Sequence, residues 1–174
     1  MTNPENIAFI DAQNLQLGTT KSTSSWKVDL FKFRIYLKEK YDIQKAYYFI
    51  GFMDENNQDL YSRIQESGFI IIFRSHSHNL ISNKKGNVDT DIVFSIMREY
   101  HENQNIGKIY LVSGDGDYFK TIKYLHDNNK LGKILFPSRE KASSLYKKLT
   151  GSHFDYLDKA DVKKKIEYKK EGLA

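Results

Sequence analysis

Acidic residues follow two short apolar runs that are far apart in the chain. Residues 7–10 lead into Asp11, and residues 109–112 lead into Asp115 and Asp117. Short buried runs of this kind are typical of strands in a parallel sheet, and ligands of α/β proteins gather outside the carboxyl ends of such strands. Carboxylates at that edge are suited to hold a divalent cation. The pattern therefore favours a metal-dependent hydrolase.

A third acidic residue, Asp89, opens the helical stripe that precedes the second apolar run. If the two strands are neighbours, Asp11, Asp89 and Asp115 reach one crevice. Carboxylates that close repel one another and raise each other's pKa, and a bound Mg²⁺ or Mn²⁺ would relieve the repulsion. Such an ion also lowers the pKa of its water and neutralises charge on a reacting phosphate. Asn14 adds a neutral group that can position water or phosphate.

Simpler roles exist for the same residues. Asp89 and Asp117 both precede helical stripes, where Asp is a preferred N-cap. Asp115, Gly116 and Asp117 also have the composition of a turn. Asp11 requires a partner, because an acid at the end of a buried strand is costly to leave alone. The joint placement of the acids at one sheet edge favours the metal site.

Other metal and phosphate motifs are missing or incomplete. An EF-hand loop fails because Phe119 follows Asp117 at the next alternate position. The chain has no Gly-Lys-Ser/Thr phosphate loop, no GxGxxG after the first strand and no serine nucleophile elbow. His76 and His78 lie two residues apart in a polar loop, but no third zinc ligand is near them.

Strand and helix patterns alternate along the chain. Strands are predicted over residues 7–10, 46–52, 69–73, 108–112, 133–136 and, as a short sixth, 153–157. This alternation predicts an α/β fold of three layers, with a mainly parallel sheet of five or six strands between helices.

The predicted helices lie between these strands. They comprise a stripe from Leu30 to Tyr41 capped by Ser24 or Ser25, a short helix stopped by Gly68, helices after Asp89 and Asp117, and a helix over 143–149. Residues 18–25 and 75–88 read as polar loops, which lie next to Asp11 and Asp89.

The composition fits one ordinary domain. The chain has 174 residues, 40% of them hydrophobic, and no cysteine. Without cysteine, disulfides and cysteine-ligated zinc are excluded, and a reducing compartment fits. No signal pattern begins the chain, and no stretch approaches the roughly 20 apolar residues of a membrane span. We therefore expect a soluble cytoplasmic protein.

Positive charge is concentrated at the C-terminal end. The net charge is +5, and residues 159–174 hold six Lys and three acidic residues. We expect a domain over residues 1–158 and a Lys-rich tail over 159–174, which is either a charged helix or disordered. A basic segment suits a polyanionic partner, whereas the body of the chain is nearly neutral.

Three stretches, 9–15, 85–89 and 111–119, together resemble the NYN domain family. That family includes the LabA-like proteins and belongs to the PIN-like nuclease superfamily. The resemblance runs from about residue 7 to residue 157. It implies a Rossmann-like fold, an acidic pocket for Mg²⁺ or Mn²⁺, and endonuclease action, usually on RNA, by metal-activated water.

The resemblance also assigns residues to roles. Asp11 and Asn14 match the first motif, Asp89 the second, and Asp115 and Asp117 the third. The four aspartates would hold metal, and Asn14 would orient water or substrate.

One position departs from the family pattern. Many relatives carry a further Asp six residues after Asp89, where this chain has Ser95. Asp91 lies one helical turn earlier and on the same face as Ser95, so it is a candidate substitute ligand. Ser113 matches the small hydroxyl residue of the third motif and is a candidate substrate contact.

The leading hypothesis is a single-domain ribonuclease that cuts RNA, most simply single-stranded RNA. The alternative is a non-catalytic RNA-binding or scaffolding module on the same fold, motivated by Ser95 and the nearly neutral body; a phosphatase acting on small phosphates is a third idea. Homodimers are common in related folds. Candidate phosphate contacts, which can equally be solvated surface charges, are Lys84, Lys85, Arg74 and Arg139.

Overall fold

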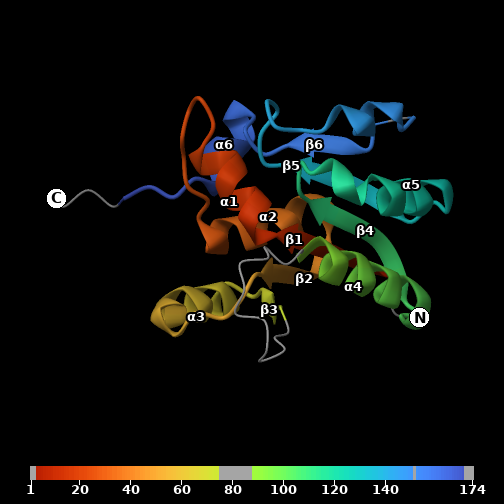
Figure 1. The fold of residues 1–174 in the computed structure, drawn as a ribbon, viewed down its shortest axis with the longest axis horizontal. Helices are drawn as coiled ribbons and strands as arrows, with labels where there is room; N and C mark the ends of the chain where they lie inside the picture. The colour runs from red at the N-terminus through yellow and green to blue at the C-terminus, as the bar shows by residue number, and fades with distance from the viewer. Residues whose placement is uncertain (1–2, 75–87, 151, 171–174) are drawn as a thin grey trace, which may run out of the picture.

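The computed structural model describes residues 3–74, 88–150 and 152–170. Over these residues the chain builds a central six-stranded sheet with the order β3-β2-β1-β4-β5-β6, in which every neighbouring pair is parallel (Figure 1). The strands are β1 (Glu5–Asp11), β2 (Ile43–Ile50), β3 (Ile70–Phe73), β4 (Ile106–Val112), β5 (Leu131–Phe136) and β6 (Phe154–Tyr156). This is the doubly wound Rossmann order, so the predicted α/β fold is confirmed.

Helices cover both faces of the sheet. They are α1 (Ala12–Thr20), α2 (Leu30–Tyr41), α3 (Gln58–Glu66), α4 (Val88–Glu102), α5 (Phe119–Asp127) and α6 (Ala160–Ile166), with short 3₁₀ helices η1 (Glu55–Asn57), η2 (Gly116–Tyr118) and η3 (Ser144–Lys148). No helix in the described part of the chain is long and apolar enough to cross a membrane.

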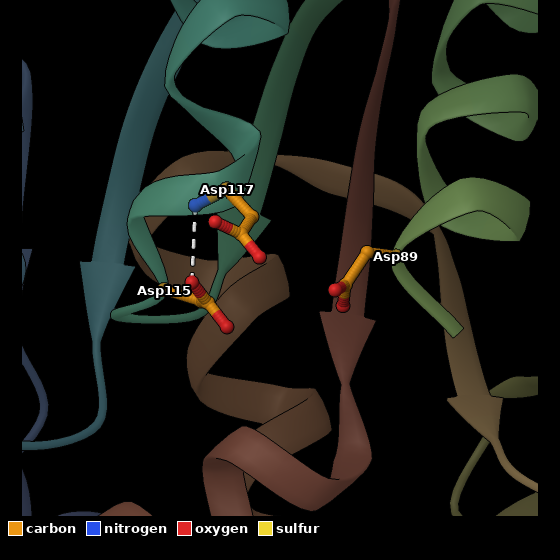
Figure 2. A group of neighbouring side chains, drawn as sticks. All are labelled: Asp89, Asp115 and Asp117. Atoms are coloured by element: carbon orange, nitrogen blue, oxygen red, sulfur yellow. Dashed lines mark hydrogen bonds between the residues drawn. The ribbon is translucent and has the colours of Figure 1, made fainter. Parts of the chain in front are cut away.

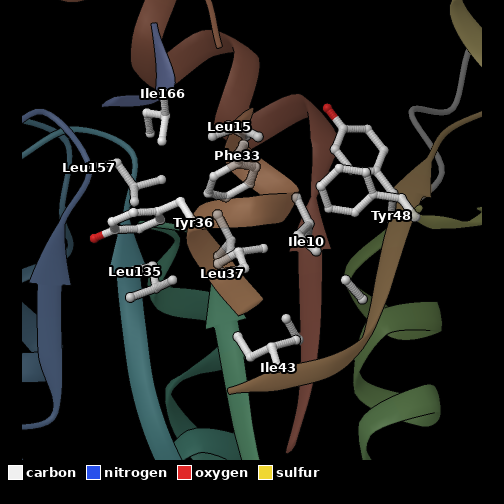
Figure 3. Packing of buried hydrophobic residues seen from close by; sticks show 14 of the residues in the cluster. Ile10, Leu15, Phe33, Tyr36, Leu37, Ile43, Tyr48, Leu135, Leu157 and Ile166 are labelled. Atoms are coloured by element: carbon white, nitrogen blue, oxygen red, sulfur yellow. The ribbon is translucent and has the colours of Figure 1, made fainter. Parts of the chain in front are cut away.

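Alternate residues of β1 supply two separate cores, because successive side chains of a strand point to opposite faces. Ile7 and Phe9 pack in a cluster with buried residues of α4, α5 and η3. Ala8 and Ile10 pack in a second cluster with buried residues of α1, α2, α3 and α6 (Figure 3). All four side chains are fully buried. The apolar run therefore forms the middle of the sheet and fixes where Asp11 emerges.

The predicted cap of the helix after the first loop is wrong. α2 begins after Asp29, whose Oδ1 accepts the N–H of Lys32 at 3.1 Å, so neither Ser24 nor Ser25 caps it. Trp26, only 5% exposed, anchors the preceding segment in the core and delays the start of the helix. Asp and Ser are both good N-caps, so local sequence does not separate these choices.

Residues 18–20 belong to α1 and not to the predicted loop. The Thr19 and Thr20 hydroxyls donate to the carbonyls of Leu15 and Gln16, at 3.0 Å and 2.7 Å, and so fit within the helix. Two further predicted elements also differ from the structure. β2 begins at Ile43 and ends at Ile50, earlier than predicted at both ends, and the helix predicted over 143–149 is the 3₁₀ helix η3.

The Lys-rich segment contains a packed helix. Val162 and Ile166 of α6 are buried in the core shared with α2. The predicted short sixth strand is present as β6. His76, His78, Lys84 and Lys85 lie outside the described residues.

Candidate active site

The sheet order brings the two acidic strand ends together. β1 and β4 are neighbours, with Ile10 paired to Val112, so Asp11 and Ser113 follow side by side at the carboxyl edge. The chain continues from β1 to β2 on one side and from β4 to β5 on the other. This is the switch point of a doubly wound sheet, where ligands of such folds bind.

Three carboxylates gather at this switch point. One oxygen of each of Asp89, Asp115 and Asp117 lies within 4.8 Å of the others. Asp89 comes from the first turn of α4, and the other two come from the turn between β4 and α5 (Figure 2). Asp89 and Asp115 are half-buried, and Asp117 is exposed. Neither Asp89 nor Asp117 is a helix N-cap, because each lies inside its helical segment.

Asp115 is itself the N-cap of η2. Its Oδ1 accepts the N–H of Asp117 at 3.0 Å, and its own N–H donates to Ser113 Oγ at 3.2 Å. The Tyr146 hydroxyl donates to the Asp115 carbonyl. These hydrogen bonds fix the turn. Because Oδ1 caps the helix, Asp115 Oδ2 takes no part in the cap.

Asp11 lies outside this group of three, and Tyr118 links it to the group. The buried Tyr118 hydroxyl lies 3.0 Å from Asp11 Oδ2 and 2.6 Å from Asp89 Oδ1. A phenol has a single proton, so it donates fully to only one of two carboxylates at a time. The Tyr118 proton is therefore shared between Asp11 and Asp89, and a cation at the site would favour the charged form of both acids.

The surroundings of Asp11 disfavour its charged form. Burial raises the pKa of the Asp11 carboxyl above its usual value, and the charges of Asp89 and Asp115 raise it further. Hydrogen bonds from the Asn14 N–H and from Tyr118 act in the opposite direction without cancelling the rise. The same surroundings raise the pKa of Tyr118, so its hydroxyl keeps its proton.

Asn14 connects the two acidic segments. Its backbone N–H donates to Asp11 Oδ1 at 2.9 Å, and its side-chain Oδ1 accepts the N–H of Gly114 at 2.8 Å. The carboxamide oxygen is therefore engaged, and the NH₂ group is the half that can serve a ligand.

The donor set fits a small divalent ion. Carboxylate oxygens are the ligands that Mg²⁺ and Mn²⁺ prefer. Two ligands of one Mg²⁺ lie at most about 4.2 Å apart, twice a metal–oxygen distance of about 2.1 Å. Oxygens within 4.8 Å of one another need only a small side-chain movement to reach that geometry.

The other predicted site residues lie in different surroundings. Asp91 is half-buried on α4 and is outside the group of three. Residues two apart on an α-helix are turned by about 200°, so Asp91 and Asp89 lie on nearly opposite faces. Ser95 is buried, at 9% exposure. The Ser95 side chain is therefore packed inside the protein at its position in α4.

Ser113 is fully buried and supports the acidic turn. Arg74 follows β3, with its guanidinium carbon 5.4 Å from the centre of the Phe52 ring. Arg139 is exposed, and its guanidinium carbon lies 4.7 Å from the centre of the Tyr156 ring.

Two tyrosines at the site were not predicted from sequence. Tyr118 follows Asp117 directly within the third motif, and that adjacency is a usable signal. Tyr146 lies 31 residues beyond Asp115 in the chain, and only the fold brings its hydroxyl to the turn.

The fold and the acidic group define an α/β protein with a candidate divalent-metal site at its switch point. The family model of the NYN domain matches residues 6–156. The chain therefore belongs to the NYN domain family, within the PIN-like superfamily. Proteins of this family are generally ribonucleases and typically depend on divalent metal.

A solved structure shares the fold. It is a protein of unknown function from Vibrio parahaemolyticus RIMD 2210633, with a TM-score of 0.72 and 17% sequence identity over 97% of this chain and 99% of that chain. At this identity the likeness shows the fold alone. No curated protein matches the chain.

Proposed function

We propose that the chain is a metal-dependent endoribonuclease that hydrolyses phosphodiester bonds of RNA. One observation carries the proposal. Asp89 of α4 and the pair Asp115 and Asp117 after β4 have carboxylate oxygens within 4.8 Å of one another at the switch point of the sheet, in a chain of the NYN domain family.

Asp89, Asp115 and Asp117 would hold the ion, with Asp11 behind them. Bound there, Mg²⁺ or Mn²⁺ supplies a water of lowered pKa and neutralises charge that develops on the phosphate. Asn14 orients water or substrate through its NH₂ group, and Tyr118 holds Asp11 and Asp89 at a fixed separation. Attack by water on the phosphorus, with the 3′ oxygen as the leaving group, would give one product with a 5′-phosphate and the other with a 3′-hydroxyl, the outcome that the family suggests.

Cleavage of labelled single-stranded RNA and DNA tests the proposal. We expect cutting with Mn²⁺ or Mg²⁺, none with EDTA, and a loss of at least a hundredfold in Asp115→Asn. The variant keeps Oδ1 as the acceptor for the Asp117 N–H, so it should fold normally. Asp59→Asn removes the same charge from an exposed position on α3 and should cut like the parent protein. Equal activity in Asp115→Asn and the parent would refute the assignment.

A non-catalytic RNA-binding module is the second candidate. It is favoured by the buried Ser95 and by the position of Asp91 outside the acidic group. It predicts RNA binding that survives EDTA without cutting. Because Val162 and Ile166 are buried, the contribution of the Lys-rich segment is best tested by neutralising the exposed Lys164, Lys165 and Lys169 and not by truncation.

We also propose, on the resemblance to the family, a preference for RNA and for single strands, a LabA-like subtype and a homodimer. We further propose a cytoplasmic location, which suits a chain without cysteine. Metal binding by Asp91 and substrate contacts by Ser113, Arg74, Arg139, Lys84 and Lys85 belong to the same proposal.

A further inference from the structure

A cavity of about 230 Å³ lies beside the acidic group. Asn14 and Gly114, which connect the acidic segments, also line this cavity, together with Lys21, Ser138 and Lys141. The volume corresponds to roughly seven water molecules at liquid density. The cavity is therefore large enough for a phosphate group, and it shares a wall with the candidate metal site.

The fold builds this cavity from three segments. Gly18 lets α1 approach the end of β5 closely, since a Cβ there would lie 2.6 Å from Pro137 Cβ. Lys141 Nζ donates to the Leu17 carbonyl at 2.9 Å, which joins the segment after β5 to α1. Thr23 Oγ1 donates to Glu140 Oε1 at 2.9 Å and links the residues that follow α1 to the segment after β5.

The cavity is lined by hydrogen-bond donors with unused capacity. Ser138 is 2% exposed, and its Oγ is buried without a hydrogen-bond partner among the described residues. Such an orphaned hydroxyl in a protein interior usually marks a missing ligand or water. The Lys141 ammonium has three protons and uses one on Leu17, and the Asn14 NH₂ group remains for a ligand. The Lys21 ammonium adds a second positive charge.

We propose that this cavity binds a phosphate of the nucleic-acid strand, adjacent to the phosphate held at the acidic group. Ammonium, hydroxyl and amide donors are the groups with which proteins bind phosphate oxygens. Asn14 and Gly114 are linked to the acidic segments, through Asp11 and as the neighbour of Asp115, and they also line the cavity that Lys21 and Lys141 line. The acidic group and the lysine-lined cavity would therefore act as a cation site and an anion site along one nucleic-acid strand. The inference rests on the proposed function for the identity of the ligand as nucleic acid.

Titration with inorganic phosphate in EDTA tests the anion site without any need for catalysis. We expect the backbone amide signals of Gly114 and Ser138 to shift in NMR spectra of the whole chain. In the double variant Lys21→Gln, Lys141→Gln the apparent affinity should fall at least tenfold, and in Ser138→Ala it should fall by a smaller factor. The control variant Lys27→Gln, Lys148→Gln carries the same net charge, and both of its lysines are exposed elsewhere. Glutamine at position 141 keeps a donor for the Leu17 carbonyl. No shift in the parent protein, or equal affinities in the two double variants, would overturn the site.

RNA binding then distinguishes the site from the catalytic proposal. In EDTA, the Lys21→Gln, Lys141→Gln variant should bind single-stranded RNA about tenfold more weakly than its control. Its log–log salt slope should be shallower by about 0.7 for one lost phosphate contact. Phosphate binding with no RNA cleavage would support the subsite while refuting the nuclease. Cleavage with identical RNA affinity and salt slope in both double variants would refute the subsite and leave the nuclease standing.

Discussion

Tyr118 places one hydroxyl group between two carboxylates of the site, and its side chain is fully buried in the core beneath them. Tyr118 therefore contributes both to the packing of the core and to the arrangement of the site. The ring fills the layer between β1 and the helices α4 and α5, while the hydroxyl sets the spacing of Asp11 and Asp89. Burial and the charges of Asp89 and Asp115 disfavour the charged form of Asp11, and a divalent ion at the site would favour it.

Tyr118→Phe removes the shared donor and leaves the buried Asp11 with fewer hydrogen bonds. We expect the free energy of unfolding in EDTA at pH 7 to fall by about 1–3 kcal/mol. The pKa of Asp11 is already raised by burial, and loss of the donor raises it further. Asp11 is therefore protonated at a higher pH than an ordinary Asp, and the deficit should shrink as the pH falls through this raised pKa.

Urea unfolding at several pH values measures this effect. Tyr168→Phe is the control, because Tyr168 is 54% exposed and its hydroxyl has no hydrogen bond among the described residues. A deficit that is constant with pH, or absent, would contradict the proposed role of the hydroxyl.

At the scale of elements, α1 connects the two halves of the site. Its N-cap is Asp11, its first turn carries Asn14, and its last turn contacts the end of β5 at Gly18 and Pro137. The position of Asn14 thus depends on the close approach of α1 to the end of β5, which only glycine at position 18 permits. In the sequence, Gly18 begins a Ser- and Thr-rich stretch, and that composition predicts a loop although the residue lies in α1.

Gly18→Ala should push α1 away from β5, because the added Cβ would lie 2.6 Å from Pro137 Cβ. Overpacking of this kind costs about 1–3 kcal/mol. We expect a lower melting temperature together with a reduced cleavage rate, since Asn14 moves with the helix.

Gly51→Ala is the matched control, because a Cβ at that position meets no atom within 4 Å. Unchanged stability in Gly18→Ala would show that α1 tolerates displacement and that its packing does not position Asn14.

How far the sequence predicts the structure also differs among elements. Apolar runs such as 7–10 determine buried strands, and the switch-point rule then brings Asp11 and Asp115 to one edge. The start of α2 was not predictable, because Ser25 and Asp29 are both good caps and the choice depends on the burial of Trp26. The contact of Tyr118 with Asp89, which is 29 residues away in sequence, exists only after folding.

At the scale of the whole molecule, Asp155 links the edge of the sheet to the helical layer. Its carboxylate accepts hydrogen bonds from Lys159 at 2.6 Å, from Lys40 at 2.9 Å and from Tyr41 at 3.0 Å. Burial alone would raise the pKa of Asp155, but the hydrogen bonds from Lys159 and Lys40 outweigh it and hold the pKa well below its usual value. β6, α2 and the start of α6 are therefore joined by one charge.

A depressed pKa means that this stabilisation is fully present above the unfolded-state pKa of about 3.9 and decreases as the pH falls from there through the lowered folded-state pKa. Asp155→Asn should lower the free energy of unfolding at pH 7 by about 1–2 kcal/mol, a modest loss because both lysines are partly exposed. The difference from the parent protein should shrink steadily as the pH falls below about 4.

Urea denaturation at pH 7 and at a series of pH values below about 4 checks the acid dependence. Glu39→Gln on the exposed face of α2 is the control for charge. A deficit that stays constant over this series would mean that Asp155 contributes through packing and not through its charge.

The cleavage rate of single-stranded RNA as a function of Mn²⁺ concentration tests the central claim most directly. The claim is that Asp89, Asp115 and Asp117 bind a divalent ion required for hydrolysis. We predict a saturable rise in rate for the parent protein and for Asp59→Asn, and no detectable rise for a folded Asp115→Asn. Cutting in EDTA, or the same Mn²⁺ dependence in Asp115→Asn as in the parent, would contradict the claim.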